Sequence, residues 1–211
     1  MALLLVRHAH ALARAEWDGD DLGRQLSVKG HRQAAALVAV LAEFKPARLL
    51  SSPYLRCLDT LRPLADHLGS VVEPDGRLAE GSGRAAVDLV RALANDRVVL
   101  CTHGDVIPDV LKALADQDHV DLGVRPQVEK GSVWVLEGDG QRFTTALYLP
   151  PRTRTELAPA ERGPTGMATG SLAAAAPPLG QPLRQDVVVG GGPAGDHCGR
   201  ACRLSLRSGS C

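Results

Sequence analysis

Short apolar runs alternate along most of the chain with longer stretches in which apolar residues recur at helical spacing. The short runs predict strands over residues 2–6, 47–52, 71–73 and 97–103. The longer stretches predict helices over residues 28–44, 53–68, 84–94 and 106–115. Ser27 is placed to cap the first helix with its hydroxyl, Pro46 stops that helix, and Pro53 opens the next one.

Two further β-rich runs, residues 132–137 and 142–149, flank a turn of Gly138, Asp139 and Gly140, and this spacing predicts a hairpin. Strands that alternate with helices indicate a mainly parallel sheet with helices on both faces. We therefore predict an α/β fold, a three-layer α/β/α sandwich in which the hairpin adds antiparallel edge strands to a mixed sheet. In such sheets, catalytic side chains collect at the carboxyl ends of the strands.

The apolar pattern ends near residue 150. All six aromatic residues precede that point, whereas 16 of the 60 residues from Arg152 onward are Gly or Pro. A segment of this composition cannot offset the entropy cost of ordering it. We predict one folded domain over residues 1–150 and a disordered Gly/Pro/Ala-rich tail over residues 151–211.

The tail contains a run, residues 186–195, that matches a strand followed by G-x-G-x-x-G, the pattern of a dinucleotide-binding turn. Only 16 residues follow Gly195, which leaves no room for the second strand and its ribose-binding acid. Cys198 and Cys202 lack the further ligands that a metal site needs. We expect no bound cofactor and no metal.

Charge and length narrow the class of partner. Lysine plus arginine (24) balance aspartate plus glutamate (24), so no overall field attracts nucleic acid or an anionic membrane surface. The apolar run at residues 2–6 is too short for a signal-peptide core or a membrane span. We expect a cytoplasmic protein without nucleic-acid or membrane partners, and the oligomeric state stays open.

Two histidines directly follow apolar strands: His8, beside Arg7, and His103, beside Gly104. One such histidine is more often structural, but two at matching strand ends, one joined to an arginine, favour catalysis. A phosphoryl group in transfer needs fixed cations around its oxygens, and arginine supplies a planar fork of donors. Arg56 lies one turn into the helix after the second strand, where it either reaches the same sheet edge or faces solvent.

These residues resemble the motifs of the histidine phosphatase superfamily, which has the phosphoglycerate mutase-like fold. That family combines a strand followed by Arg-His-Gly, a Ser-x-x-x-Arg-x-x-x-Thr motif after the second strand, and a strand followed by His-Gly. This chain has LLLVRHAHA at 3–11, SPYLRCLDT at 52–60 and LCTHGD at 100–105. The resemblance covers residues 2–149, and the short length is similar to the branch of small phosphohistidine phosphatases and the phosphatase half of some actinobacterial Nudix proteins.

The resemblance implies that His8 is the nucleophile and attacks phosphorus as a neutral imidazole. It also implies that Arg7, Arg56 and His103 hold the phosphoryl oxygens, with Gly104 beside them in the substrate site.

The family generally protonates the leaving group with a carboxylic acid. Glu80 lies where that acid is expected, and the alternative is an exposed loop glutamate. Asp105 is the second candidate for the acid. Ala9 replaces the usual Gly, and we expect its methyl group to narrow the pocket floor. Trp17, Asp20 and Asp21 form either a substrate-side loop or a capped surface turn.

The implied activity is a metal-independent phosphatase that hydrolyses a phosphomonoester or a protein phosphohistidine through a phosphohistidine on His8. A phosphotransferase of the phosphoglycerate mutase type is one alternative, although such enzymes normally carry longer insertions. A non-catalytic domain that binds phosphorylated protein is another, although the nucleophile and the clamp are all present. The substrate stays open among phosphorylated small molecules, nucleotides and phosphohistidine proteins.

Overall fold

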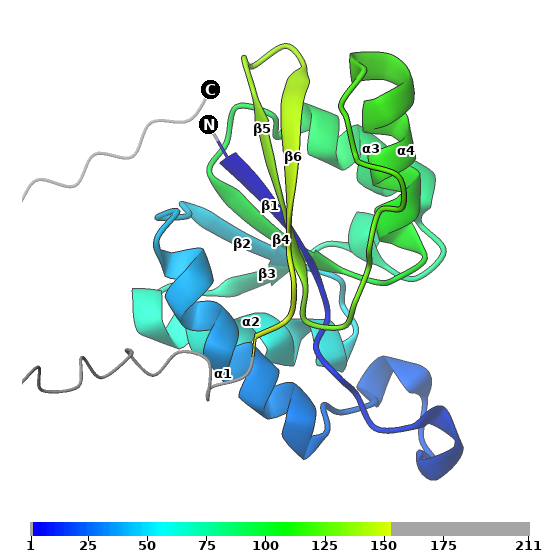
Figure 1. Ribbon diagram of the computed structural model, residues 1–211. Coiled ribbons are helices and arrows are strands. Elements are labelled where there is room, and N and C mark those ends of the chain that lie inside the picture. Colours follow the sequence, from blue (N-terminus) through cyan, green and yellow to red (C-terminus); the bar gives the residue numbers. More distant parts are fainter. Residues whose placement is uncertain (1, 153–211) are drawn as a thin grey trace, which may run out of the picture. The chain divides into compact units, whose positions relative to one another are not determined.

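The structure is a computed structural model that describes residues 2–152 (Figure 1). From residue 153 onward the predicted tail, with its glycine-rich run and its cysteines, lies outside the described residues. The strands are β1 (Ala2–Arg7), β2 (Arg48–Ser51), β3 (Val72–Pro74), β4 (Val98–Thr102), β5 (Val133–Gly138) and β6 (Phe143–Leu149). The helices are α1 (Val28–Ala42), α2 (Leu55–Leu68), α3 (Gly83–Ala92) and α4 (Val106–Asp118). The short 3-10 helices are η1 (Arg14–Glu16), η2 (Asp21–Gly23) and η3 (Gly76–Leu78).

The strands form one mixed sheet in the order β3-β2-β4-β1-β5-β6. β1, β4, β2 and β3 run parallel, and the hairpin of β5 and β6 adds two antiparallel strands next to β1. β1 and β4 are neighbours, and Arg7 at the end of β1 is opposite Thr102 at the end of β4. The residues that follow these two strands, His8 and His103, therefore lie side by side at the carboxyl edge of the sheet.

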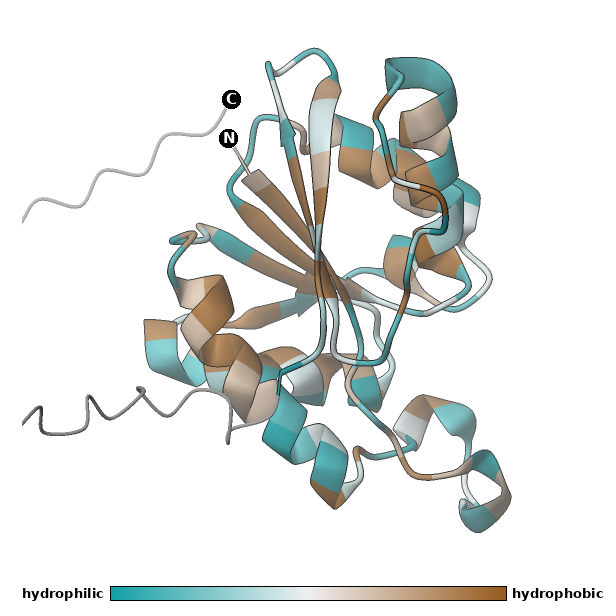
Figure 2. Ribbon diagram, in the orientation of Figure 1, coloured by the Kyte–Doolittle hydropathy of each residue, from teal (hydrophilic) through white to brown (hydrophobic). Residues whose placement is uncertain are grey.

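Successive side chains along each strand point to opposite faces of the sheet, so the core has two layers. α1 and α2 cover one face, and α3 and α4 cover the other (Figure 1). In β1, Leu3 and Leu5 pack with the α3 and α4 side chains, whereas Leu4 and Val6 pack with those of α1 and α2. Fully burying such a side chain contributes about 1.5–3 kcal/mol. Figure 2 shows the central strands as hydrophobic and the outer faces of the helices as mixed. The predicted three-layer sandwich is confirmed.

Two helix boundaries differ from the predictions because of the backbone angles of the residues beside them. α2 begins at Leu55 rather than at Pro53, because the backbone of Tyr54 is extended at φ −67° and ψ 133°. α4 continues to Asp118, where His119 ends it in the left-handed conformation at φ 60°. Among residues 2–152, no helix has the length and apolar character needed to cross a membrane.

Candidate active site

The two strand-end histidines meet at the carboxyl edge of the sheet, as the strand order requires. The backbone amide of His8 donates to the carbonyl of Thr102 at 3.0 Å, which fixes the end of β1 against β4. The His8 and His103 rings lie edge to face, with centroids 5.4 Å apart. Both side chains are buried, with relative exposures of 6% and 1%. A ligand that reaches one imidazole is therefore in reach of the other.

His8 is held in the tautomer that a nucleophile needs. Its Nδ1 lies 2.8 Å from the carbonyl oxygen of Ala9, which can only accept, so Nδ1 carries the proton. The other nitrogen, Nε2, then keeps its lone pair. Burial lowers the pKa of His8 to about 3, and the charges of Arg56 and Arg7 lower it further. The imidazole is therefore neutral and nucleophilic near neutral pH.

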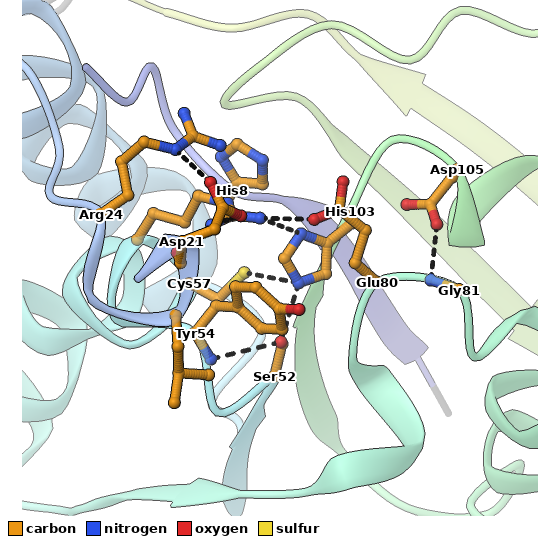
Figure 3. A network of polar contacts seen from close by, with 12 residues as sticks. His8, Asp21, Arg24, Ser52, Tyr54, Cys57, Glu80, Gly81, His103 and Asp105 are labelled. Carbon is orange, nitrogen blue, oxygen red and sulfur yellow. Dashed lines mark hydrogen bonds and ion pairs between the residues drawn. The ribbon is translucent and has the colours of Figure 1, made fainter. Parts of the chain in front are cut away.

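His103 is oriented by contacts at both ring nitrogens. Nη2 of Arg56 lies 3.3 Å from Nδ1, and because a guanidinium has only donors, Nδ1 accepts. Nε2 carries the proton and donates to Oγ of Ser52 at 2.8 Å. The Tyr54 ring packs edge-on against the imidazole with centroids 4.8 Å apart. Figure 3 shows Ser52 and Tyr54 beneath the His103 ring.

Arg56 is almost wholly buried and its charge is matched by two carboxylates. Its side chain is 1% exposed. Nη1 donates to the carbonyl and the carboxylate of Asp21, at 2.9 and 3.0 Å, and Nη2 donates to Oε2 of Glu80 at 2.8 Å. The guanidinium carbon also lies 4.4 Å from the centroid of the Tyr54 ring, in the range of a cation–π contact. The alternative of a solvated surface arginine is therefore wrong.

Asp21 is a site residue whose contact with Arg56 the sequence does not reveal. It opens η2, and Asp20 caps that turn by accepting from the amide of Leu22. The Asp21 carboxylate is bonded by Arg24 at 2.7 Å and paired with Arg14 at 3.1 Å as well as with Arg56. Burial opposes ionisation, but the Arg24 hydrogen bond and the Arg56 charge hold its pKa at about 2. The segment is thus a capped surface turn at Asp20, and Asp21 supports the site through its contacts with Arg56.

The Arg7 guanidinium makes different contacts from that of Arg56. It donates to the backbone carbonyl of Val128. A Cβ on Gly104 would come within 2.6 Å of its Cζ, so only glycine leaves room for the arginine there. The Nε donors of both Arg7 and Arg56 are buried and lack a hydrogen-bond partner among the described residues. Buried donors of this kind call for a ligand or water.

The remaining motif residues explain why the spacing between Ser52 and Thr60 matters. Oγ1 of Thr60 accepts from the amide of Ala9 at 2.9 Å and donates to the carbonyl of Arg56 at 2.7 Å, which ties α2 to the turn after His8. The prediction for Ala9 is wrong. Its methyl group is fully buried in a small cluster with Leu26 and Ala34, and Ala9 does not line the cavity.

An open cavity of about 300 Å³ lies over these groups. Its lining residues are Arg7, His8, Arg14, Arg24, Arg56, Glu80, His103, Gly104, Asp105 and Lys130. The structure therefore brings all six predicted site residues together. Asp105 lies further from the histidines than Glu80 (Figure 3), and its Oδ2 accepts from the amide of Gly81 at 2.7 Å. Within residues 2–152, no group of three His, Cys, Asp or Glu side chains is placed to hold a metal ion.

The sequence reasoning missed Arg14, Arg24 and Lys130. Arg14 and Arg24 lie on the irregular segment around η1 and η2, where no periodicity marks them. Lys130 carries a clearer signal, because it lies three residues before Val133, the first residue of β5. β5 runs antiparallel to β1, so the beginning of β5 lies at the carboxyl end of β1, where the site is.

The comparisons with known proteins agree with this geometry. A family model described as the histidine phosphatase superfamily (branch 1) matches residues 3–84, which include Arg7, His8, Arg56 and Glu80. The chain belongs to the histidine phosphatase superfamily. An 8-oxo-(d)GTP phosphatase of Mycolicibacterium smegmatis is 34% identical over 158 residues, covering 71% of this chain and 48% of that protein. This chain thus spans about half the length of that curated superfamily relative.

Solved structures of superfamily proteins share the fold. SixA of Agrobacterium tumefaciens has a TM-score of 0.59 at 22% identity, covering 72% of this chain and 98% of that one. A protein histidine phosphatase SixA in complex with tungstate has a TM-score of 0.57 at 20% identity, covering 74% and 99%. The mycobacterial glucosyl-3-phosphoglycerate phosphatase Rv2419c with VO3 has a TM-score of 0.55 at 21% identity, covering 67% and 95%.

Proposed function

We propose that this chain is a metal-independent phosphatase that transfers a phosphoryl group to Nε2 of His8 and then to water. The observation that carries the proposal is the fixed neutral tautomer of His8 inside a cavity lined by guanidinium groups. The Nε2 lone pair forms a bond to phosphorus as the bond from phosphorus to the leaving group breaks. Water then attacks the phosphohistidine and gives one proton to the carboxylate that protonated the leaving group, as the bond from phosphorus to Nε2 breaks. Inorganic phosphate is released, and both the imidazole and the acid are restored.

Arg7, Arg56 and His103 form the clamp for the phosphoryl oxygens. The unpartnered Nε donors of both arginines are available to these oxygens. On Arg56, Nε and Nη2 form one planar fork, and Glu80 now occupies the Nη2 end. A phosphoryl oxygen that takes both donors therefore displaces Glu80. His103 lines the same cavity, and its contact with Ser52 through Nε2 fixes the ring beside the phosphoryl group.

Glu80, once displaced from Arg56, lies beside the phosphoryl group and serves as the general acid. It donates its proton to the leaving group as the bond to phosphorus breaks. Its side chain is 42% exposed, so it exchanges protons with solvent and can move. Asp105 is the second candidate, although its carboxylate already accepts from the Gly81 amide.

Hydrolysis is preferred over transfer between two phosphorylated substrates. The cavity is open to solvent, and the connections around it are short, so water reaches the phosphohistidine. A non-catalytic role in binding phosphorylated proteins does not explain why His8 is held neutral with its lone pair free. The relative from Mycolicibacterium smegmatis is named for a nucleotide substrate, which supports nucleotides as one substrate class. The cytoplasmic location stays a prediction.

Hydrolysis of p-nitrophenyl phosphate by the wild type and by His8→Ala tests the proposal. The variant is expected to lose activity by a factor on the order of 10⁴–10⁶, as when other covalent nucleophiles are removed. The wild-type rate is expected to persist in EDTA and to fall with vanadate, because cationic side chains supply the charge that a metal supplies elsewhere. A strict need for an added divalent ion, or near wild-type activity in His8→Ala, would contradict the proposal.

A further inference from the structure

Lys130 is a cavity residue that neither the motifs nor the proposed clamp uses, and unlike Arg14 and Arg24 it forms no ion pair among residues 2–152. It lies in the loop before β5, half-buried, and lines the cavity together with Arg7 and His8. Its pKa is lowered, first by burial and then by nearby cations, of which Arg7 contributes most. Within the described part of the chain, no carboxylate forms an ion pair with its ammonium group.

The loop that carries Lys130 is fixed to the end of β1. The amide of Gly131 donates to the carbonyls of Arg7 and His8, at 3.1 and 3.2 Å. Nε2 of Gln33, on α1, donates to the carbonyl of Lys130 at 2.9 Å, and Oε1 of Gln33 accepts from the amide of His10. These contacts fix the backbone of Lys130 at the end of β1, and its side chain lines the same cavity as His8.

The cations of the cavity differ in what neutralises them. Arg56, Arg14 and Arg24 are all paired with the carboxylates of Asp21 or Glu80. Arg7 and Lys130 form no ion pair among residues 2–152. Asp105 acts on Arg7 by its charge without bonding to it. A bound anionic ligand would therefore supply the direct counter-charge that Arg7 and Lys130 lack. Arg7 lies next to His8 and serves the transferred phosphoryl group. Lys130 is then left for a second anion.

The size of the cavity agrees with a second anionic group. One water molecule takes up about 30 Å³ in the liquid, and a bonded heavy atom takes up less. A phosphate group, with five heavy atoms, therefore occupies on the order of 100 Å³. The cavity measures about 300 Å³. We infer that Lys130 selects substrates in which the transferred phosphoryl group is joined to a second phosphate, as in a nucleoside diphosphate or triphosphate. This inference depends on the proposed function, since it deepens the substrate class of the same site.

The test compares GDP with GMP as substrates for the wild type, Lys130→Met and Lys130→Arg. The wild type is expected to prefer GDP in kcat/KM. Lys130→Met is expected to lower kcat/KM for GDP by on the order of 10–100-fold, the value of one charge-assisted hydrogen bond, and that for GMP by less than about threefold. Lys130→Arg keeps the charge and is expected to retain most of the GDP activity.

Lys29→Met is the matched control, because it removes the same charge from an exposed lysine that does not line the cavity. It is expected to leave both substrates unaffected. Binding of pyrophosphate and orthophosphate, measured by calorimetry, gives a readout without turnover. Lys130→Met is expected to weaken pyrophosphate binding more than orthophosphate binding.

The outcomes separate this inference from the proposed function. Equal losses on GDP and GMP would place Lys130 in the clamp for the transferred group, and no loss on either would make it a bystander. Each result overturns the inference and leaves the phosphatase proposal standing. The same holds if the wild type hydrolyses p-nitrophenyl phosphate or a phosphohistidine peptide but neither nucleotide. A wild type that hydrolyses none of these substrates overturns the proposed function itself.

Discussion

The two arginines of the clamp line the same cavity and are held in different ways. Arg56 is buried between two carboxylates, Asp21 and Glu80. Arg7 lies on Gly104, donates to a backbone carbonyl, and has Asp105 and Lys130 as charged neighbours in the cavity. Two carboxylates bond directly to Arg56, whereas no carboxylate among residues 2–152 bonds directly to Arg7, so its donors are left for a ligand. The same residue type is therefore positioned by ion pairs on one side and by packing on the other.

The largest expected effect comes from removing each guanidinium in turn. Arg56→Ala and Arg7→Ala should both lower kcat/KM for p-nitrophenyl phosphate by on the order of 10³–10⁵-fold, the range for an arginine that stabilises phosphoryl transfer. Steady-state kinetics checks this. A loss at only one of the two positions would show that the clamp has one arginine rather than two.

The stabilities of the same two variants should differ. Arg56→Ala leaves Asp21 and Glu80 without their buried partner, so its free energy of unfolding should fall. The fall should be smaller than the ~3–5 kcal/mol of a fully buried pair, because both carboxylates are partly exposed. Arg7→Ala removes a cation that has no carboxylate partner within residues 2–152 and should cost less. Urea denaturation of both variants measures the difference, and equal losses would contradict the comparison.

Glu80→Gln should reveal the general acid through its dependence on the leaving group. An alkyl phosphate, whose alkoxide leaves poorly, should be hydrolysed on the order of 10²–10⁴-fold more slowly, whereas nitrophenyl phosphate needs little protonation and should lose far less. A phosphohistidine substrate should fall between them. Kinetics on the three substrates decides this. Equal losses on all three would mean that Glu80 only shapes the pocket, and Asp105 would be tested next.

Asp21→Asn should have a moderate effect, because it weakens the hold on Arg56 without removing the clamp. Misplacing a catalytic group by about 1 Å costs ~10²-fold, so a looser guanidinium should cost on the order of 10-fold in kcat/KM. The inhibition constant of vanadate should rise in parallel. Asp20→Asn is the matched control, since Asp20 lies next in sequence, caps η2 and makes no contact with Arg56. Similar losses in both variants would mean that only the loop, not the ion pair, matters.

The smallest expected effect is the change in the free energy of unfolding with pH that His8 causes. The pKa of His8 is about 3 in the folded chain against an ordinary value near 6.5, so the unfolded chain binds the extra proton in this interval. Above pH ~6.5 the His8 imidazole is neutral in both states and does not change the free energy of unfolding with pH. As the pH falls from ~6.5 towards 3, the free energy of unfolding decreases by at most about 1.4 kcal/mol per pH unit. His8→Asn should therefore lose less stability than the wild type between pH 6.5 and 4.5. Parallel slopes in urea denaturation would contradict the buried neutral imidazole.

Sequence reasoning succeeded where periodicity and strand ends decide the structure. Because parallel strands deliver their last residues to one edge, the positions of His8 and His103 follow from the apolar runs before them. The place of Arg56 followed from its motif, although α2 begins closer to it than predicted. The position before β5 could have drawn attention to Lys130. Asp21 and Arg14, by contrast, lie on an irregular segment whose course depends on long-range contacts, such as that of Asp21 with Arg56. No local pattern encodes such contacts.

Covalent trapping tests the central assignment most directly. The wild type is mixed with a labelled phosphate ester, quenched in alkali, digested and analysed by mass spectrometry. We predict phosphate on Nε2 of His8, stable in alkali and lost in acid, with no label in His8→Ala. The amount of labelled His8 at the time of the quench depends on how slowly the phosphohistidine is hydrolysed compared with how fast it forms. Label on another residue, or turnover by the wild type with no labelled His8 at any quench time, would contradict the assignment of His8 as nucleophile.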